Sequence, residues 1–483
     1  MITCDLLMIP SEVVYNILWI VYALTVAGII VVVLTENRNP VKSLAWITVL
    51  MALPAVGIVL YIFFGRNLRG SRLISRRKRR QLRRHIVQKP QRVNIDSLPL
   101  SDASRQQIHL AKSLQGSQYY EGNTIDIFTD GRSKFAQLEA DILSATTYIN
   151  LQYYIIENDT IGRRISELLQ RKAREGVKVR IIYDAVGCFP VRGRFFKRMR
   201  RAGIEVYPFM KINFPQFATR LNWRNHRKVV VIDGRIGYIG GMNIADRYVD
   251  GGKQGHWRDT HLRIEGPAVI GLQYSFAVDW NFVRKELLDD AVAPGAASGD
   301  TTVGAQVVTS GPMGAWSNIA LVMLKAIGNA KKRIWLQTPY FLPSNDLLRA
   351  LQAAALSKID VRLMMPRHSD SFMLTYASRS YIKECIASGI KVYFYEKGML
   401  HAKTMLVDDE FVTVGSLNLD FRSIEHNFEG NAMLYGADFA RRMSDIMEAD
   451  LRQCTRIQSS AWRHRPWYKK FVESIYRLFS PIL

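Results

Sequence analysis

Two segments of the chain carry the same polar and small residues at the same spacing. The first segment, His226–Asn243, reads HRKVVVIDGRIGYIGGMN, and the second, His401–Asn418, reads HAKTMLVDDEFVTVGSLN. Each begins with His, has Lys two residues later and Asp five residues after that, and then has Gly and Asn. A single H-x-K pattern arises easily by chance. Two ungapped copies in one chain indicate a duplicated functional unit.

The residue types in these segments suit the chemistry of a phosphodiester. Buried lysines are costly without an anionic partner, and Lys and Asn can donate to phosphate oxygens as charge develops on them, without a metal ion. One imidazole can attack phosphorus while the other, protonated, delivers a proton to the leaving alkoxide and then acts as base for the incoming alcohol. One site therefore needs two histidines in opposite protonation states. If the two copies meet, the site holds His226, Lys228, Asn243, His401, Lys403 and Asn418.

Acidic residues should orient the two imidazole rings through their Nδ1 atoms. The candidates are Asp259, in HWRDTHLRIEGP, and Glu429, in HNFEGN. Asp233 and Asp408 are counted in the catalytic set with His226, Lys228, His401 and Lys403, although we expect them to support the strand–turn geometry rather than to contact substrate. The sequence offers no carboxylate cluster or Cys/His set with the spacing of metal ligands, so it predicts no metal and no cofactor.

The positions of the cysteines and the charge of the chain narrow the classes of protein to which it can belong. Four cysteines are scattered, which argues against a disulfide framework and against a zinc site: Cys4, Cys188, Cys385 and Cys454. The 483 residues carry a formal charge of +24, which indicates an anionic partner such as nucleic acid, an acidic membrane surface or a phosphate-bearing substrate.

The first 65 residues favour a membrane among these partners. Residues 13–34 and 44–64 are uncharged runs, each long enough to cross a hydrocarbon core of about 30 Å. The alternatives are a cleaved signal peptide or a buried core helix, but the first run is too long for a signal core and lacks a preceding basic region. Arg66–Arg84 then carries ten basic residues and no acid, which predicts a cytoplasmic location for that side of the second span.

The elements expected to position the repeated segments are themselves duplicated. Residues 145–152 (ATTYINLQ) and 330–337 (AKKRIWLQ) share Ala, Ile, Leu and Gln at the same offsets, and each is followed by a helical stretch and a strand-like run. That order predicts a β-α-β unit in each half. In chain order, we expect a transmembrane hairpin at 1–65, a basic juxtamembrane linker at 66–118, repeats at 119–290 and 303–456 joined by 291–302, and an amphipathic membrane-interface segment at 457–483. A core-packing helix is the equal alternative for the last segment.

Both segments match the paired H-x-K-x4-D-x6-G-x2-N signature, so the chain resembles the phospholipase D superfamily. Within it, the chain is similar to bacterial cardiolipin synthases with two membrane spans, through its N-terminal hairpin, TPYFLPSNDLL at Thr338–Leu348, LNLDFRS at Leu417–Ser423 and the closing FSPIL. The resemblance implies an α/β fold of two phospholipase D-like domains, with two mainly parallel or mixed sheets packed about a pseudo-twofold axis.

The resemblance also implies an activity and a role for each residue. Two phosphatidylglycerols would be joined to give cardiolipin and glycerol, through a covalent phosphatidyl-histidine. The nucleophile falls on His226, oriented by Asp259, and the acid and base on His401, held by Glu429. The phosphate contacts fall on Lys228, Asn243, Lys403 and Asn418. One departure is Gly241, where many members have Ser, which would remove at most one phosphate contact.

The expected partners are phosphatidylglycerol, other anionic phospholipids and the bacterial inner membrane, with the catalytic body facing the cytoplasm and no nucleic acid bound. The oligomeric state stays open, a homodimer included. A phospholipase D-type lipid hydrolase or another headgroup-exchanging enzyme would use the same site. A membrane-tethered nucleic-acid binder or nuclease fits the charge but not the spans or the lack of a basic–aromatic stacking module. An inactive scaffold is disfavoured because neither copy of the signature has lost a member.

Overall fold

The computed structural model describes residues 11–36, 40–61, 65, 70, 72–87, 93–191, 193–210, 223–288, 290 and 303–480. The described chain divides into an N-terminal unit within Met1–Arg69 and a larger unit within Gly70–Leu483. The predicted join at 291–302 lies outside the described residues.

The N-terminal unit contains three apolar helices. Helix α1 (Ser11–Glu36) is long and apolar enough, by length and composition, to cross a membrane. The second predicted span is not one helix where it is described: α2 (Pro40–Ala52) stops before Leu53, and α3 (Pro54–Leu60) begins at a proline. Leu53 leaves the helical conformation (φ −132°, ψ 70°), as expected before a proline, which disfavours the helical region for the residue that precedes it. The end of that span, residues 62–64, lies outside the described residues.

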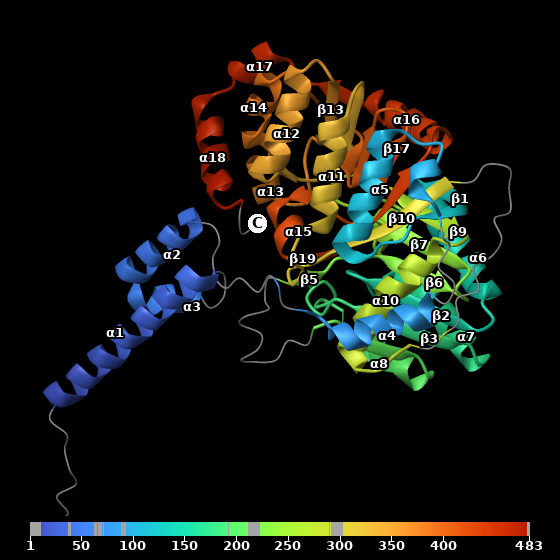
Figure 1. Cartoon of the computed structure of the whole chain (residues 1–483), viewed down its shortest axis with the longest axis horizontal. Helices are drawn as coiled ribbons and strands as arrows, with labels where there is room; N and C mark the ends of the chain where they lie inside the picture. Colours follow the sequence, from blue (N-terminus) through green and yellow to red (C-terminus); the bar gives the residue numbers. More distant parts are fainter. Residues whose placement is uncertain are drawn as a thin grey trace, which may run out of the picture. The chain divides into compact units, whose positions relative to one another are not determined.

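The larger unit contains the duplicated halves (Figure 1). In the first half, the elements are β1 (Tyr120–Phe128), α6 (Gly131–Ser144), β2 (Tyr148–Tyr153), α7 (Thr160–Arg174), β3 (Lys178–Tyr183), α8 (Gly193–Arg201), β4 (Glu205–Pro208), β5 (Arg224–Asn225), β6 (Val229–Ile232), β7 (Ile236–Gly240), β8 (His256–Arg258), β9 (His261–Glu265) and α10 (Val269–Arg284).

The second half repeats this plan. Its elements are β10 (Val303–Ser310), α11 (Asn318–Asn329), β11 (Arg333–Gln337), β12 (Phe341–Leu342), α12 (Asn345–Leu356), β13 (Asp360–Pro366), α13 (Phe372–Ser380), α14 (Ile382–Ala387), β14 (Lys391–Tyr395), β15 (Gly398–Leu400), β16 (Thr404–Val407), β17 (Phe411–Gly415), β18 (Leu419–Asp420), α15 (Phe421–Glu425), β19 (Asn427–Tyr435), α16 (Ala437–Leu451) and β20 (Cys454–Arg456).

One mixed sheet runs through both halves. Within the described residues it has sixteen strands, with β1 and β10 paired antiparallel near its middle. Outward from that pair the order is β9, β7, β6, β2, β3, β4 on one side and β19, β17, β16, β11, β13, β14, β20 on the other. Corresponding strands therefore occupy corresponding places. The resemblance implied two sheets, but β1 pairs with β10, so the two halves share one continuous sheet with no free edge between them.

The predicted β-α-β units form the outer parts of the sheet. Strands β2, β3 and β4 are parallel, with α7 and α8 as their connections, and β11, β13 and β14 are parallel in the second half. The strands next to the repeated His-Lys-Asp segments, β6 and β16, instead pair antiparallel with both of their neighbours. In each segment His and Lys precede the strand and Asp follows it, so the strand separates the His-Lys pair from the Asp.

The segment predicted as a juxtamembrane linker, 66–118, is largely folded onto the larger unit where it is described. Helix α4 (Arg76–Ile86) is capped by the Ser75 side chain, which accepts from the Lys78 N–H at 3.3 Å. Its Leu82 and Ile86 are buried, and the helix lies against α10. Helix α5 (Asp102–Gln115) packs against α11. Buried apolar residues at helical spacing thus make this segment part of the fold.

Candidate active site

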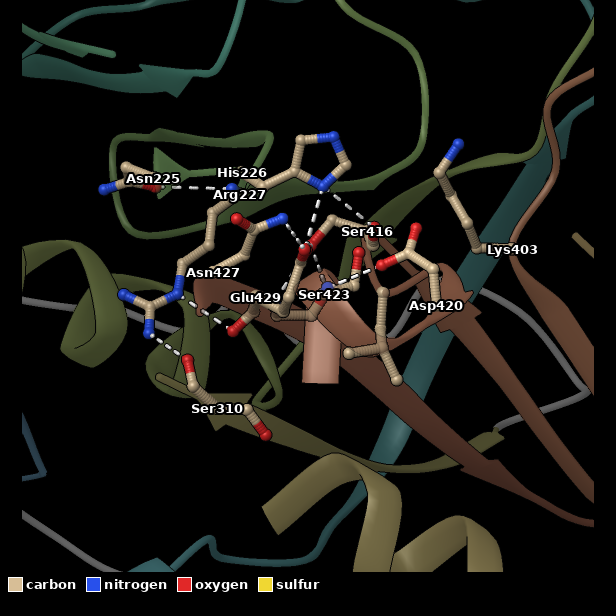
Figure 2. A network of polar contacts seen from close by, with 12 residues as sticks. Asn225, His226, Arg227, Ser310, Lys403, Ser416, Asp420, Ser423, Asn427 and Glu429 are labelled. Atoms are coloured by element: carbon tan, nitrogen blue, oxygen red, sulfur yellow. Dashed lines mark hydrogen bonds and ion pairs between the residues drawn. The ribbon is translucent and has the colours of Figure 1, made fainter. Parts of the chain in front are cut away.

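A two-residue parallel strand pair places His226 beside an acid of the other half. Strand β5 pairs with the beginning of β19, so that Arg224 lies opposite Asn427 and Asn225 opposite Phe428. The next backbone contact, from the His226 N–H to the Phe428 carbonyl oxygen at 2.9 Å, continues this pairing. Glu429 follows directly in β19, and Figure 2 shows its carboxylate below the His226 ring.

The equivalent arrangement places His401 beside an acid of the first half. Strand β15 pairs in parallel with β8, and the His401 N–H donates to the Arg258 carbonyl oxygen at 2.7 Å. Asp259 is the next residue. In both cases a short strand before the histidine extends alongside the strand before the acid, and this backbone pairing sets the position of the side chains.

The structure therefore pairs each histidine with the acid that we expected beside the other histidine. His226 Nδ1 lies 3.0 Å from each carboxylate oxygen of Glu429 and 3.1 Å from the Ser416 carbonyl oxygen. His401 Nδ1 lies 2.6 Å from Asp259 Oδ2. Both predicted acids do contact a repeated histidine, but the assignment of Asp259 to His226 and of Glu429 to His401 is wrong. The cause is the exchange of short strands between the halves.

Lys228 and Lys403 are buried next to the histidines. Lys228 Nζ donates to the His226 carbonyl oxygen at 2.7 Å. Lys403 Nζ donates to the His401 carbonyl oxygen and lies 2.7 Å from His401 Nδ1 and 3.8 Å from Asp259 Oδ2. Each ammonium has three N–H donors, so donors beyond the carbonyl contact can serve substrate oxygens.

Asn243 and Asn418 are buried at the ends of their segments. Asn243 accepts from the Ile155 N–H at 3.2 Å and donates to the Tyr248 hydroxyl at 2.9 Å. The Asn418 side-chain oxygen is buried and has no hydrogen-bond partner among the described residues. Both predicted amides are thus buried, and Asn418 keeps an unused acceptor.

Aromatic residues that we did not predict as part of the site surround the two imidazoles. Tyr154 meets the His226 ring edge to face with centroids 4.9 Å apart, and Trp257 lies 5.2 Å from the His401 ring. The Tyr248 hydroxyl lies 3.5 Å from His401 Nδ1. The adjacent pair Tyr153 and Tyr154, at the end of β2, is the sequence signal that could have indicated Tyr154. Tyr248 and Trp257 lie between motifs and carry no pattern of their own.

Asp233 and Asp408 do not lie with the histidines, because each sits at the far end of its strand. Asp233 accepts backbone N–H donors from Thr146, Thr147 and Tyr148 at 2.8–2.9 Å, and Asp408 accepts the equivalent three donors from Lys331, Lys332 and Arg333. Both aspartates adopt a positive φ, 53° and 52°, which Asp tolerates better than most residues. They fix the turn to the start of the neighbouring strand, as we expected, and are not catalytic contacts.

Burial shifts the protonation of the site. It lowers the pKa of His226, a shift that Glu429 opposes and Lys228 reinforces, and it lowers the pKa of His401 to about 4, with Lys403 adding to the shift. It also lowers the pKa of Lys403 to about 8. Both imidazoles are thus neutral near pH 7 before an anionic substrate arrives, while Lys403 keeps most of its charge. A phosphodiester beside His401 would favour the protonated ring.

The low pKa of His401 predicts an acid-sensitive fold. In the unfolded chain the pKa of histidine is about 6.5, so between that pH and about 4 the unfolded state binds more protons than the folded one. Stability is then fully present above the unfolded pKa and decreases as the pH falls through this window. Between pH 6.5 and 4, measured in detergent, we expect the melting temperature of His401→Gln to fall less than that of the parent. The control His464→Gln, at an exposed site, should behave like the parent. Equal losses in parent and His401→Gln would contradict the prediction.

The two histidine–carboxylate couples, His226 with Glu429 and His401 with Asp259, differ in one neighbouring residue. This residue is Gly241 in the first segment and Ser416 in the second. The Ser416 hydroxyl donates to Glu429 and so supports a carboxylate. The phosphate contact that the resemblance implies for a serine at this place is therefore not what the Ser416 hydroxyl makes here. A Cβ atom on Gly241 would lie 2.1 Å from Asp259 Oδ1, a distance that atoms do not tolerate. Glycine at 241 therefore makes room for the shorter acid, which takes the place that a serine side chain would need.

A serine at 241 should displace the Asp259 carboxylate from His401 Nδ1. We expect Gly241→Ser to lower activity at least about tenfold, because a displaced carboxylate no longer fixes the tautomer of the catalytic ring. Gly328→Ser, where an added Cβ meets nothing within 4 Å, is the matched control and should keep full activity. Turnover of the two purified variants measures the effect. Full activity of Gly241→Ser would show that the carboxylate does not need this space.

Comparison with known proteins matches these two halves to a single family. A family model described as a cardiolipin synthase, phospholipase D-like domain matches residues 138–269 and 323–451, and one described as phospholipase D-nuclease N-terminal matches residues 23–66. A cardiolipin synthase of Geobacillus kaustophilus is 37% identical over 95% of this chain and 92% of its own. The major cardiolipin synthase of Bacillus subtilis is 38% identical over 96% of this chain and 98% of its own.

The solved structures support the fold. A phosphatidylserine synthase from Haemophilus influenzae matches 78% of this chain and 98% of its own, with a TM-score of 0.60 and 13% sequence identity. At that identity the likeness concerns the arrangement of the elements alone.

Proposed function

Because the chain belongs to the phospholipase D-like cardiolipin synthases, we propose that His226 carries a phosphatidyl group from one phosphatidylglycerol to another. The observation that supports this most directly is the pair of histidine–carboxylate couples beside two buried lysines. The matching strand order of the halves supports an approximate twofold relation between the couples. Such a site can hold one phosphodiester between a nucleophile and a proton carrier.

In the first step, His226 Nε2 attacks phosphorus and the bond from phosphorus to the glycerol oxygen breaks. The contact of Nδ1 with Glu429 at 3.0 Å keeps the proton on Nδ1 and the lone pair on Nε2, as a nucleophile requires. His401, protonated beside the bound anion, gives its Nε2 proton to the leaving oxygen. Lys228 and Lys403 stabilise the charge that grows on the phosphate oxygens.

In the second step, the terminal hydroxyl of another phosphatidylglycerol attacks phosphorus. His401, now neutral, accepts the hydroxyl proton, the bond between phosphorus and His226 Nε2 breaks, and cardiolipin is released. The contact of His401 Nδ1 with Asp259 at 2.6 Å orients the ring for both transfers. The enzyme returns to its starting protonation state, so the two steps balance without a cofactor.

Supplying the purified protein with phosphatidylglycerol alone tests the proposed reaction. Cardiolipin and free glycerol should appear in equal amounts, and activity should persist in excess EDTA because the lysines supply the positive charge. Phosphatidic acid plus glycerol instead would identify a lipid hydrolase, the second candidate on the same site. Activity that is lost in EDTA and restored by a divalent ion would contradict the metal-free step.

We also propose that the N-terminal unit is a two-span hairpin and that both termini and the larger unit face the cytoplasm. The support is the apolar helix α1, the apolar run interrupted at Pro54, and the ten basic residues that follow at Arg66–Arg84. Basic residues next to a span remain on the cytoplasmic side. Phosphatidylglycerol and other anionic lipids of the inner membrane are then the partners, and nucleic acid is not expected among them.

The C-terminal segment has the composition of a membrane-interface helix. Helices α17 (Ser459–Arg463) and α18 (Trp467–Leu478) follow β20, and α18 packs on α13. Trp467, Phe471 and Leu478 are exposed on α18, at 76%, 58% and 80%. Exposed aromatic and aliphatic side chains on a helix that also carries Lys and Arg suit the boundary between headgroups and acyl chains.

One labelling experiment tests the orientation and the interface helix together. An engineered cysteine at Leu356, 64% exposed, should react with an impermeant maleimide in inverted membrane vesicles but not in intact spheroplasts. A cysteine at Leu478 should stay unreactive in both until detergent is added, because lipid would cover it. Labelling of the first site in spheroplasts would overturn the orientation. Prompt labelling of the second in inverted vesicles would place α18 in water.

A further inference from the structure

A cavity of about 370 Å³ lies between α4, the end of α5, α10 and the loop after β10. Arg72, Arg79 and Arg83 line it from one side and Arg227 from the other. None of the described residues lining the cavity is Asp or Glu. A concave space with several guanidinium groups and no acid in its wall has the electrostatic character of an anion site.

The arginines of α4 differ in whether they line the cavity. Arg79 and Arg83 follow the helical spacing of the buried Leu82 and Ile86 and therefore face the larger unit. Burial raises the pKa of Tyr274, which also lines the cavity, and Arg79 and Arg83 partly offset that rise because their charges act on its hydroxyl. Arg76 and Arg80 are exposed and do not line the cavity.

A buried hydroxyl in the wall provides an independent sign of a ligand. Ser275 is 6% exposed, lines the cavity, and its Oγ has no hydrogen-bond partner among the described residues. A buried hydroxyl without a partner costs free energy, and a phosphate oxygen would be a suitable acceptor. Guanidinium groups bind phosphate through paired N–H donors.

The cavity is separate from the catalytic couples, although it lies directly behind one of them. Arg227 stands between His226 and Lys228 and extends to the other side of the segment, as Figure 2 shows. It donates to the backbone oxygens of Glu429 at 3.0 Å and Ser310 at 3.2 Å, and it forms an ion pair with Asp279. Its own charge is thus balanced, which leaves the arginines of α4 and of the preceding loop to attract the anion.

We propose that this cavity is a second anion site that binds a phosphate group. Its wall also includes apolar residues such as Leu73, Ile270 and Val278, and Trp316 in the loop after β10 is 56% exposed. A wall of this kind accommodates the glycerol and first acyl carbons of an anionic lipid as well as its phosphate, and tryptophan favours the membrane interface. The favoured source of the phosphate is therefore a lipid headgroup. Free phosphate is the other source.

Hydrogen exchange of the full-length protein in phosphatidylcholine nanodiscs tests the site and its ligand. One arm adds phosphatidic acid, which has no headgroup alcohol to lose or donate, and the other adds inorganic phosphate. We expect phosphatidic acid to slow exchange in peptides covering 72–87 and 311–318. Slowing by inorganic phosphate to the same extent would support the site with free phosphate as its ligand. No change in either arm would overturn the proposal.

Two double variants with the same loss of charge provide the control. In Arg72→Gln/Arg79→Gln the half-saturating amount of phosphatidic acid should rise at least about tenfold, which corresponds to about 1.4 kcal/mol, because two charges that line the cavity are gone. Arg76→Gln/Arg80→Gln should respond like the parent, since those side chains do not line the cavity. Equal weakening in both variants would show a general surface effect and overturn the site. Melting temperatures equal to that of the parent confirm that both variants fold.

Discussion

His226→Ala is expected to abolish both cardiolipin formation and any covalent adduct, because no nucleophile remains in the site. His401→Ala should lower turnover of phosphatidylglycerol about a thousandfold, since glycerol must leave as an unprotonated alkoxide. With a p-nitrophenyl phosphatidyl ester, whose leaving group needs no proton, His401→Ala should still release a burst of p-nitrophenol and accumulate adduct. Stopped-flow absorbance measures the burst, and no burst is expected from His226→Ala.

Mass spectrometry of the trapped adduct identifies the modified residue. Phosphorus on His226 in the His401→Ala protein is the expected result. Phosphorus on His401 in the unmodified enzyme would show that the two roles are reversed. His464→Ala, at an exposed histidine on the surface, should match the parent in both assays and exclude a nonspecific effect of losing an imidazole.

Because Glu429 contacts His226 and Asp259 contacts His401, we predict that the two acids act on different steps. Glu429→Gln should slow adduct formation about a hundredfold with either donor, because it removes the charge that contacts Nδ1 of the nucleophile at 3.0 Å. Asp259→Asn should slow the reaction of phosphatidylglycerol by a similar factor but leave the p-nitrophenol burst nearly intact. Burst rates with the two donors make the comparison.

Asp438→Asn removes an exposed carboxylate on α16 and should leave both rates unchanged. The converse result, with Asp259→Asn suppressing the burst and Glu429→Gln sparing it, would mean that the acid beside a histidine does not act through that histidine. Melting temperatures of the variants separate this outcome from a loss of folding.

Much of the site follows from sequence because it is encoded by local spacing. His226, Lys228 and Asn243 recur as His401, Lys403 and Asn418. In the structure all six are buried, and each histidine contacts one of the two predicted acids. The pairing of those acids was not predictable in this way. It depends on β5 with β19 and β15 with β8, and strands of two or three residues carry no periodic pattern.

The fold shows the same division between local and distant information. The β-α-β units follow from alternating strand and helix patterns, and the structure contains them. The single sheet depends on the contact of β1 with β10, whose partners are far apart in the chain. The basic run at Arg66–Arg84 was interpreted from its charge, whereas Leu82 within the run and Ile86 just after it are the buried residues of α4 that hold the helix against the larger unit.

The exchange of short strands between the halves has a consequence for synthesis of the chain. When the first half leaves the ribosome, Asp259 has no His401, His226 has no Glu429, and β1 has no β10. The early half therefore presents an open strand edge and unmatched buried charges, which are the features that make nascent domains prone to aggregation. Maturation of the catalytic centre is thus postponed until translation has passed β19.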